Sequence, residues 1–321
     1  MEIDIIKRMQ NMDVYPNDRL GQHILINEAA LEVFAGNVSR GGNVLEIGSG
    51  PGNITERIAE RAKKVVAVEI DRKFEPILSK LQEEHPNVSV VYKDVLGLNL
   101  GNLMRSGLFS SDWQLMSNLP FHITEPFLKE IIDLPITDAV LILGEQMVDR
   151  IQNDNPLDYD FYRTGLTVQT FFESSVLMNL PSRYFYPEPG TDSAIVVLTP
   201  REKSEYRSNK KLSILRHLFL TESKHSPVGK IMKEAYGRVD DDVVRDKEEQ
   251  HRHDRRETKN DLRTMLKRGV YATSDDDSAS KYDNGSRLFD RIGLSNDILN
   301  KPFSRLDNQD LRDLVVALDR L

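Results

Sequence analysis

The glycine-rich segment Glu46-Ile47-Gly48-Ser49-Gly50-Pro51-Gly52 could bind a nucleoside ligand. An apolar run typical of a buried strand precedes it, and a helical pattern follows. Glycines at such a turn let the backbone approach a ligand closely, and the helix N-terminus offers free N–H groups. The spacing is G-x-G-x-G rather than the dinucleotide form, and Glu46 lies inside the segment. The pattern favours a ligand without pyrophosphate, such as S-adenosylmethionine, whose positively charged sulfur favours nearby carboxylates.

Two further acids end the next two predicted strands. Glu69 is placed to accept hydrogen bonds from ribose hydroxyls, and Asp94 is placed to accept one from an adenine amino group. Taken singly, each acid is as compatible with a solvated turn at a strand end as with a ligand-binding role. Together with the glycine segment, they indicate one site at the carboxyl ends of neighbouring strands.

A second segment, Ser117-Asn118-Leu119-Pro120-Phe121, ends the fourth predicted strand. The exocyclic amine of adenine is a poor nucleophile because its lone pair is delocalised into the ring. Hydrogen bonds from its two hydrogens to the Asn118 amide oxygen and the Pro120 carbonyl would favour the pyramidal, nucleophilic nitrogen. Phe121 offers a face for stacking an extruded base. Without this context, the same residues would indicate a strand ended by proline, with a capping Asn and a core Phe.

The elements that must position these groups alternate along residues 43–200. Short apolar runs are separated by helical patterns, which predicts an α/β, Rossmann-like fold whose sheet is mostly parallel. Two late strands are close enough in sequence to pair antiparallel at one edge. The predicted strands are residues 43–47, 64–68, 88–92, 114–116, 139–143, 175–180 and 193–198.

Taken together, these motifs resemble the rRNA adenine N6,N6-dimethyltransferase family, which also includes the macrolide-resistance rRNA methyltransferases. The resemblance covers most of the chain and rests on the order and spacing of several segments. These are Asp18–Leu25, Val44–Thr55, Ala67–Asp71, Lys93–Leu96, Ser117–Thr124, Phe185–Ala194 and the final helix at Lys301–Leu318.

The resemblance implies a class I methyltransferase that uses S-adenosylmethionine to methylate adenine N6 in ribosomal RNA. Its substrate would be small-subunit rRNA in an immature ribosomal subunit. The implied catalytic residues are Asn118, Pro120, Phe121 and Phe185, and Phe185 would flank the target base opposite Phe121. The implied cofactor-binding residues are Gln22, His23, Leu25, Glu46, Gly48, Gly50, Gly52, Glu69, Ile70, Asp94, Val95 and Asn118.

Composition limits the alternatives. The 321 residues contain no Cys, which excludes a disulfide scaffold, a Cys-ligated zinc site and a cysteine nucleophile. The N-terminus mixes charged and apolar residues, so it is not typical of a signal peptide, and no apolar run is long enough to span a membrane. We therefore expect a soluble, cytoplasmic protein without a metal, acting as a monomer.

Charge predicts two domains. Residues 1–200 contain 17 Lys and Arg against 28 Asp and Glu, and residues 201–321 contain 26 against 23. We expect a catalytic domain at 1–200 and a smaller helical, RNA-recognition domain at 201–321, with a charged insertion at about 240–287.

Two other functions remain open at this point. The chain could be a catalytically weak ribosome-assembly or RNA-binding factor, because His122 and Gly190 depart from the family pattern. It could also be an adenine methyltransferase that acts on another nucleic acid or on a small molecule.

Overall fold

The computed structural model describes residues 2–98, 100, 113–158, 162–220, 226–236, 288–289 and 292–321. Contacts divide the chain into two compact units, residues 1–154 with 164–201, and residues 155–163 with 202–321. The division at residue 201 lies next to the boundary expected from charge, but the second unit also takes residues 155–163. The charged insertion predicted at about 240–287 lies outside the described residues.

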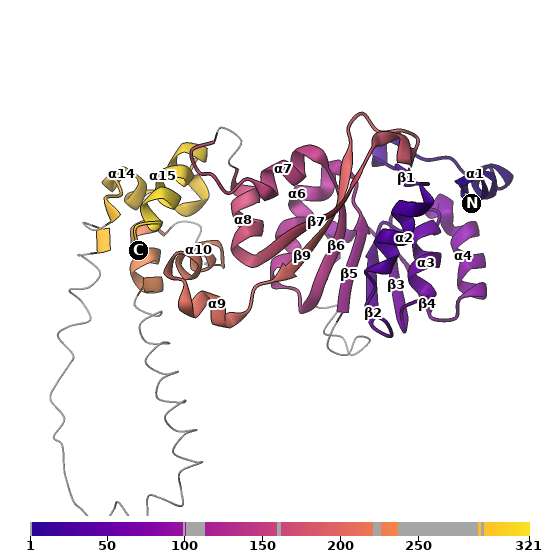
Figure 1. The fold of residues 1–321 in the computed structure, drawn as a ribbon, viewed down its shortest axis with the longest axis horizontal. Helices are drawn as coiled ribbons and strands as arrows, with labels where there is room; N and C mark the ends of the chain where they lie inside the picture. The colour runs from indigo at the N-terminus through magenta and orange to yellow at the C-terminus, as the bar shows by residue number, and fades with distance from the viewer. Residues whose placement is uncertain are drawn as a thin grey trace, which may run out of the picture. The chain divides into compact units, whose positions relative to one another are not determined.

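The first unit is built on a seven-stranded sheet with the strand order β4-β3-β2-β5-β6-β9-β7, and Figure 1 shows these strands side by side. The five strands from β4 to β6 are parallel. The chain runs from β2 through β3 to β4 and then returns to β5 on the other side of β2. Ligands of open α/β sheets bind at such a reversal of strand order. The parallel strands are β2 Asn43–Ile47, β3 Lys64–Glu69, β4 Val88–Tyr92, β5 Trp113–Asn118 and β6 Ile136–Gly144.

The antiparallel edge is formed by β7 Phe172–Leu180 and β9 Ser193–Pro200. Strand β9 pairs antiparallel with both β6 and β7, so β7 is the edge strand. The predicted α/β sheet with an antiparallel edge is confirmed. Strands β5, β6 and β7 are longer than predicted, because their added residues lack the continuous apolar pattern used to find them.

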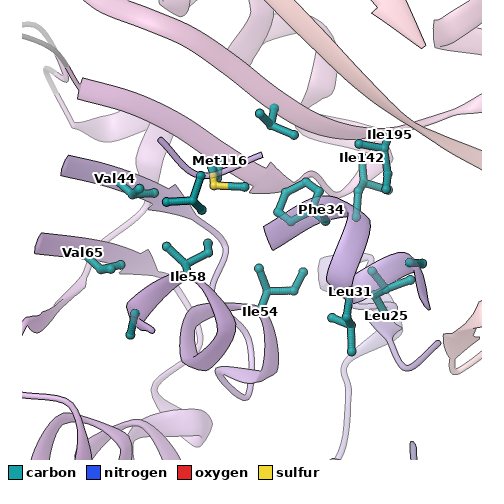
Figure 2. Packing of buried hydrophobic residues seen from close by; sticks show 14 of the residues in the cluster. Leu25, Leu31, Phe34, Val44, Ile54, Ile58, Val65, Met116, Ile142 and Ile195 are labelled. Atoms are coloured by element: carbon teal, nitrogen blue, oxygen red, sulfur yellow. The ribbon is translucent and has the colours of Figure 1, made fainter. Parts of the chain in front are cut away.

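Helices α2 and α3 cover one face of this sheet (Figure 2). Phe34 of α2 and Ile58 of α3 are fully buried against strand residues such as Val44, Val65 and Met116. Strand residues two apart share a face, so Val44 and Glu46 of β2 both point toward these helices. The helices of the first unit are α1 Glu2–Asn11, α2 Glu28–Gly36, α3 Asn53–Ala59, α4 Glu75–Glu84, α6 Phe121–Glu130, α7 Glu145–Gln152 and α8 Arg163–Phe171, which begins in the second unit. Short 3-10 helices are η1 Asp18–Leu20, η2 Arg72–Phe74, η3 Val95–Gly97, η4 Ile131–Asp133 and η5 Ser182–Tyr184.

A separate two-stranded sheet joins β1 Ile24–Leu25 to β8 Phe185–Tyr186, which lie far apart in the sequence. Next to it, Ile5 and Met9 of α1 pack with Ile24 and with Phe74 in a second hydrophobic cluster. Residues 17–23 therefore lie between two packed segments: α1 precedes them, and β1, which pairs with β8, follows them.

The second unit is helical where it is described. Arg163 donates hydrogen bonds to the carbonyls of Phe303 (2.9 Å) and Leu306 (3.0 Å) and stacks on the Phe303 ring. The final helix begins with reciprocal capping between Asp307 and Asp310, whereas a box formed by Ser304 and Asp307 would be expected from the S-x-x-D spacing. Ser304 lies one turn earlier, in the 3-10 helix η7, Phe303–Arg305. The helices are α9 Lys203–Ser208, α10 Lys210–Leu220, residues 228–236, α14 Asn296–Asn300, η7 Phe303–Arg305 and α15 Asn308–Leu318.

Within the described ranges, no helix is both long and apolar enough to cross a membrane.

Candidate functional site

A cleft opens at the carboxyl ends of β2, β3 and β5. Residues 20–24, which precede and begin β1, form another part of its wall. The cleft brings together most of the predicted site residues: Gln22, His23, Gly48, Gly50, Glu69, Ile70, Asp94, Val95, Asn118, Pro120, Phe121 and Phe185.

Three predicted cofactor-binding residues do not line this cleft: Leu25, Gly52 and Glu46. Leu25 is fully buried, and its carbonyl accepts a hydrogen bond from Asn53 Nδ2 (2.6 Å). Gly52 caps helix α3 with φ of 86°, where an added Cβ would lie 2.7 Å from Leu81 Cδ1. Both residues therefore contact the elements that flank the glycine segment on the side away from the cleft.

Glu46 points into the core because it shares a strand face with Val44. Its side chain is 2% exposed. Burial raises the pKa of Glu46 from 4.5 to about 8; the nearby Thr55 opposes this shift, and the charge of Glu69 adds to it. At pH 7 this carboxyl is protonated, so it does not supply the negative charge expected near a sulfonium.

Glu69, at the end of β3, holds the glycine segment in place. Its Oε2 accepts a hydrogen bond from the Gly50 N–H (2.7 Å), and its Oε1 accepts one from the Asp71 N–H (2.7 Å). Burial raises the pKa of Glu69, and the hydrogen bonds from backbone N–H groups oppose that shift. Gly48 and Gly50 have φ of 73° and 54°, which favours glycine at both positions.

Gln22 fixes the segment that precedes β1. Its Oε1 accepts a hydrogen bond from the Asn17 N–H (2.7 Å), and its Nε2 donates one to Asp71 Oδ2 (3.1 Å). Asp71 follows Glu69 by two residues, so residues 17–22 are tied to the same end of β3 as the glycine segment. Gly21 has φ of 62°, and an added Cβ would lie 3.3 Å from both His122 Nδ1 and Pro120 Cβ.

Asn118, the last residue of β5, has a defined amide orientation. Its Nδ2 donates a hydrogen bond to the backbone carbonyl of His23 (2.8 Å). Because a carbonyl only accepts hydrogen bonds, the NH₂ group must face it. The Oδ1 atom is thereby left as an acceptor for a ligand in the cleft.

The Pro120 carbonyl already has two donors in the first turn of α6. It accepts hydrogen bonds from the Ile123 N–H (3.1 Å) and from Thr124 Oγ1 (3.2 Å), as expected for the N-cap of a helix. The preceding residue, Leu119, also lines the cleft. The geometry therefore favours the Leu119 carbonyl, rather than that of Pro120, as the backbone acceptor beside Asn118.

The two predicted aromatic residues differ in exposure. Phe121 is 43% exposed, and an added Cβ on Gly144 would lie 3.1 Å from its ring. Its other close neighbour is the His23 ring, with centroids 6.2 Å apart and planes at 26°. Phe185 is buried in β8 opposite Leu25. Phe121 thus presents an open face, whereas Phe185 forms part of the wall.

Asp94 and Ile70 lie at the ends of β4 and β3, on the side of the cleft nearest the glycine segment. Asp94 Oδ1 accepts a hydrogen bond from the Leu96 N–H (3.0 Å) at the start of η3. Ile70 is 51% exposed, which is unusual for a large apolar side chain, and Val95 lies beside Asp94 in the same wall. An apolar pair next to a carboxylate suits the flat face and the amino group of a purine.

Sequence reasoning did not assign several other residues of the cleft. Most lie next to a predicted motif residue or at the end of a strand. They could have been predicted by including every residue near the carboxyl ends of the predicted strands. They are Leu20, Gly21, Ile24, Ile47, Val68, Lys93, Leu119, His122, Ile123, Pro189 and Ser193. Within the described residues, no group of three His, Cys, Asp or Glu side chains is arranged to hold a metal ion.

The family model of ribosomal RNA adenine dimethylase matches residues 15–242 of the chain, which include every segment of the cleft. The chain belongs to this family. Similar curated proteins include ribosomal RNA small subunit methyltransferase A of Clostridioides difficile, 32% identical over 191 residues, and that of Bacillus licheniformis, 35% identical over 190 residues. The matched regions cover 58% and 57% of this chain, and 66% and 64% of those proteins, just under two thirds of their length.

Two solved structures share the fold of this family member. A dimethyladenosine transferase from Plasmodium falciparum matches with a TM-score of 0.53 and 22% identity over 91% of this chain and 96% of that one. The 23S rRNA methyltransferase ErmE matches with a TM-score of 0.50 and 17% identity over 92% of this chain and 99% of that one. At these identities the likeness concerns the fold alone.

Proposed function

We propose that this protein methylates the N6 atom of adenine in ribosomal RNA, using S-adenosylmethionine as the methyl donor. Membership of the adenine dimethylase family supports the reaction class. The relatives named small subunit methyltransferase A support small-subunit rRNA as the substrate, within an immature subunit. The observation that carries the proposal is the meeting, in one cleft, of the glycine segment with Asn118 and the exposed Phe121.

The residues at the β2 and β3 ends fit the donor. Gly48 and Gly50 leave room for a ligand beside the backbone, and Glu69 retains acceptor capacity for ribose hydroxyls while it holds Gly50. Asp94 and Ile70 suit the amino group and the face of the donor's adenine. When bound, S-adenosylmethionine supplies a methyl group on a positively charged sulfur, which makes that group electrophilic.

The residues at the β5 end fit the acceptor base. The Asn118 Oδ1 and the Leu119 carbonyl can accept the two N6 hydrogens, which keeps the nitrogen lone pair out of conjugation with the ring. The hydrogen bond from Asn118 Nδ2 to His23 holds this acceptor in place before the base arrives, so little reorganisation is needed during the reaction. The exposed face of Phe121 can stack an extruded base.

We assign RNA recognition to the second unit together with its charged segments. Its composition supports this, because residues 201–321 have a net charge of +3, whereas residues 1–200 have −11. Action as a cytoplasmic monomer stays a prediction from the sequence.

The test combines the purified protein, methyl-labelled S-adenosylmethionine, and either ribosomal RNA or immature small subunits. We expect N6-methyladenosine or N6,N6-dimethyladenosine in the nucleosides recovered from the RNA, identified by mass spectrometry. Donor binding without any methylated adenosine would overturn the proposed activity. Binding to immature subunits without methyl transfer, unaffected by Asn118→Ala, would instead identify an assembly factor.

Asn118→Ala provides the residue-level test. Loss of a preorganised acceptor should lower turnover about a hundredfold or more, while the affinity for the donor stays within about threefold. Asn179→Ala, on the exposed side of the edge strand β7, is the matched control and should leave both quantities unchanged. Equal losses of turnover and donor affinity in the Asn118 variant would contradict its role toward the base.

A further inference from the structure

A second hollow in the first unit adjoins the cleft. Residues 12–19, which lead from α1 into η1, form one side of it, and Arg72, Lys73 and Pro76 at η2 and the start of α4 form the other. We call this hollow the N-terminal groove. Leu20 and Ile70, which lie next to its two sides in the sequence, line the cleft. The groove therefore continues from the mouth of the cleft.

The two sides of the groove are tied together through Gln22. Asn17 caps η1 by accepting a hydrogen bond from the Arg19 N–H (3.0 Å). Asp71 caps η2 by accepting one from the Lys73 N–H (3.0 Å). Because the Gln22 side chain accepts from the Asn17 N–H and donates to Asp71, the two capped turns are held in place before a ligand arrives. Such preorganisation lowers the entropic cost of binding.

The groove carries more positive than negative side chains, unlike the rest of its unit. Three cations line it, Arg19, Arg72 and Lys73, against two acids, Asp13 and Asp18. Arg19 and Lys73 are exposed, and among the residues that the structure describes neither side chain has an acidic partner. Residues 1–200 have a net charge of −11, so the groove is a local site for an anion on an acidic surface.

Arg72 links the groove to the cleft. Its guanidinium lies over the Tyr92 ring, 5.0 Å from the centroid, and its Nη1 lies 3.1 Å from Glu75 Oε2. The next residue after Tyr92 is Lys93, which is exposed and lines the cleft. Positive charge therefore continues from the groove to the cleft wall at the end of β4.

Tyr15 adds an aromatic ring to the groove. Val14 is buried in the second hydrophobic cluster, whereas the neighbouring Tyr15 is 53% exposed. Met12 and Pro76, which also line the groove, are exposed as well. An exposed ring beside cations is typical of surfaces that bind single-stranded nucleic acid, because the ring stacks on a base and the cations contact phosphates.

We propose that the N-terminal groove binds a single-stranded segment of the substrate RNA that flanks the target adenosine. Tyr15 stacks on one base of this segment, and Arg19 and Lys73 contact its phosphates. This inference rests on the proposed function, because the same RNA must place an adenine in the cleft. It gives the acidic first unit an RNA contact of its own, in addition to those assigned to the second unit.

The experiment measures binding of small-subunit rRNA, transcribed in vitro, to the full chain over a series of salt concentrations. Each phosphate contact to a single strand adds about 0.7 to the slope of log affinity against log salt. The double variant Arg19→Gln with Lys73→Gln should therefore lower the slope by about 1.4 and, at about 0.1 M salt, the affinity by roughly 25-fold. A slope within about 0.3 of the wild-type value would overturn the inference.

Arg40→Gln with Lys63→Gln is the matched control, because it also removes two positive charges. Arg40 and Lys63 are exposed near the amino ends of β2 and β3, whereas η2 follows the carboxyl end of β3. This control should keep the wild-type slope and affinity. Equal losses in the two double variants would reveal a general effect of net charge and would also overturn the inference.

Tyr15→Ala tests the stacking contact separately. Loss of one stacked base should lower the RNA affinity about tenfold, and the salt slope should stay the same because no charge is removed. Tyr15→Phe keeps the ring and should bind RNA as the wild type does. An unchanged affinity in Tyr15→Ala, or an equal loss in Tyr15→Phe, would overturn the role of the ring.

Methyl transfer distinguishes this inference from the proposed function. The Arg19 and Lys73 double variant should raise the KM for RNA about as much as it weakens binding, with turnover at saturating RNA and donor affinity changed less than about twofold. RNA binding that depends on the groove, without methyl transfer by the wild type, would overturn the proposed function alone. Methyl transfer that is independent of the groove would overturn only the groove. Weaker binding to immature subunits but not to free rRNA would assign the groove to a protein partner and would overturn its RNA contact.

Discussion

The buried Glu46 should make the stability of the first unit fall as the pH rises. Its pKa is 4.5 when exposed and about 8 in the folded protein. In the unfolded chain the carboxylate is ionised above pH 4.5, so folding at pH 7 requires uptake of a proton. Stability is therefore greatest below pH 4.5 with respect to this group, decreases through neutral pH, and levels off above pH 8.

The magnitude follows from the same two values. Each pH unit between 4.5 and 8 costs about 1.36 kcal/mol. Between pH 5 and pH 7 the wild-type protein should lose about 2.5 kcal/mol relative to Glu46→Gln, which has no proton to take up. The variant should be less stable than, or similar to, wild type at pH 5 and clearly more stable at pH 7.5.

Trp113 makes this measurable. It is the only Trp in the chain, it is buried in β5, and β5 pairs directly with the strand that carries Glu46. Its fluorescence during urea unfolding reports on the first unit, whatever the second unit does. Glu83→Gln, an exposed carboxylate on α4, is the matched control. If the stability difference between wild type and Glu46→Gln were the same at pH 5 and pH 7.5, Glu46 would be ionised in the folded protein and the reasoning would be refuted.

Two glycine substitutions test packing in the first unit, one of them beside the cleft residue Phe121. Gly165→Ala would place a methyl group on the carbonyl oxygen of Arg150, so it should destabilise the first unit by about 3 kcal/mol in the Trp fluorescence assay; a loss below about 0.5 kcal/mol would contradict this packing. Gly144→Ala would place Cβ 3.1 Å from the Phe121 ring and displace it, so turnover should fall about tenfold while donor affinity stays within about twofold; unchanged turnover would show that the position of the ring does not matter. Gly36→Ala, which meets no atom within 4 Å, is the control for both.

The sequence was sufficient to group the glycine segment with Glu69 and Asp94, because the signals for these residues are local. A strand, a glycine turn and a helix occupy fifteen or so consecutive residues around Gly50, and Glu69 and Asp94 each end a short apolar run. Parallel strands bring their carboxyl ends to one edge. Knowledge of the fold class was therefore enough to expect these residues together.

The sequence did not predict the pairing of β1 with β8. Each strand has two residues, too few to show a period, and their partners are separated by about 160 positions. That pairing brings Phe185 into the cleft wall, and the nearby contact with Pro187 orients His23. Because neither the pairing nor this contact can be found from the sequence, His23 was expected only from the family resemblance.

The prediction for Pro120 shows a different limit. Its choice as the backbone acceptor rested on residue type, since proline has no N–H. Where helix α6 begins decides which carbonyl is engaged, and helix ends are poorly defined by sequence. Because α6 begins at Phe121, the Pro120 carbonyl accepts bonds from the helix's first turn. For that reason we propose the Leu119 carbonyl as the acceptor, and the role of Pro120 stays a prediction.

Charge also separates the two ligands of this enzyme family member. Residues 1–200, which include most of the first unit, have a net charge of −11. Under the proposed function this charge would attract a cationic donor and repel RNA at long range. The site would therefore have to hold adenine by short-range groups: the oriented Asn118 amide and the Phe121 ring.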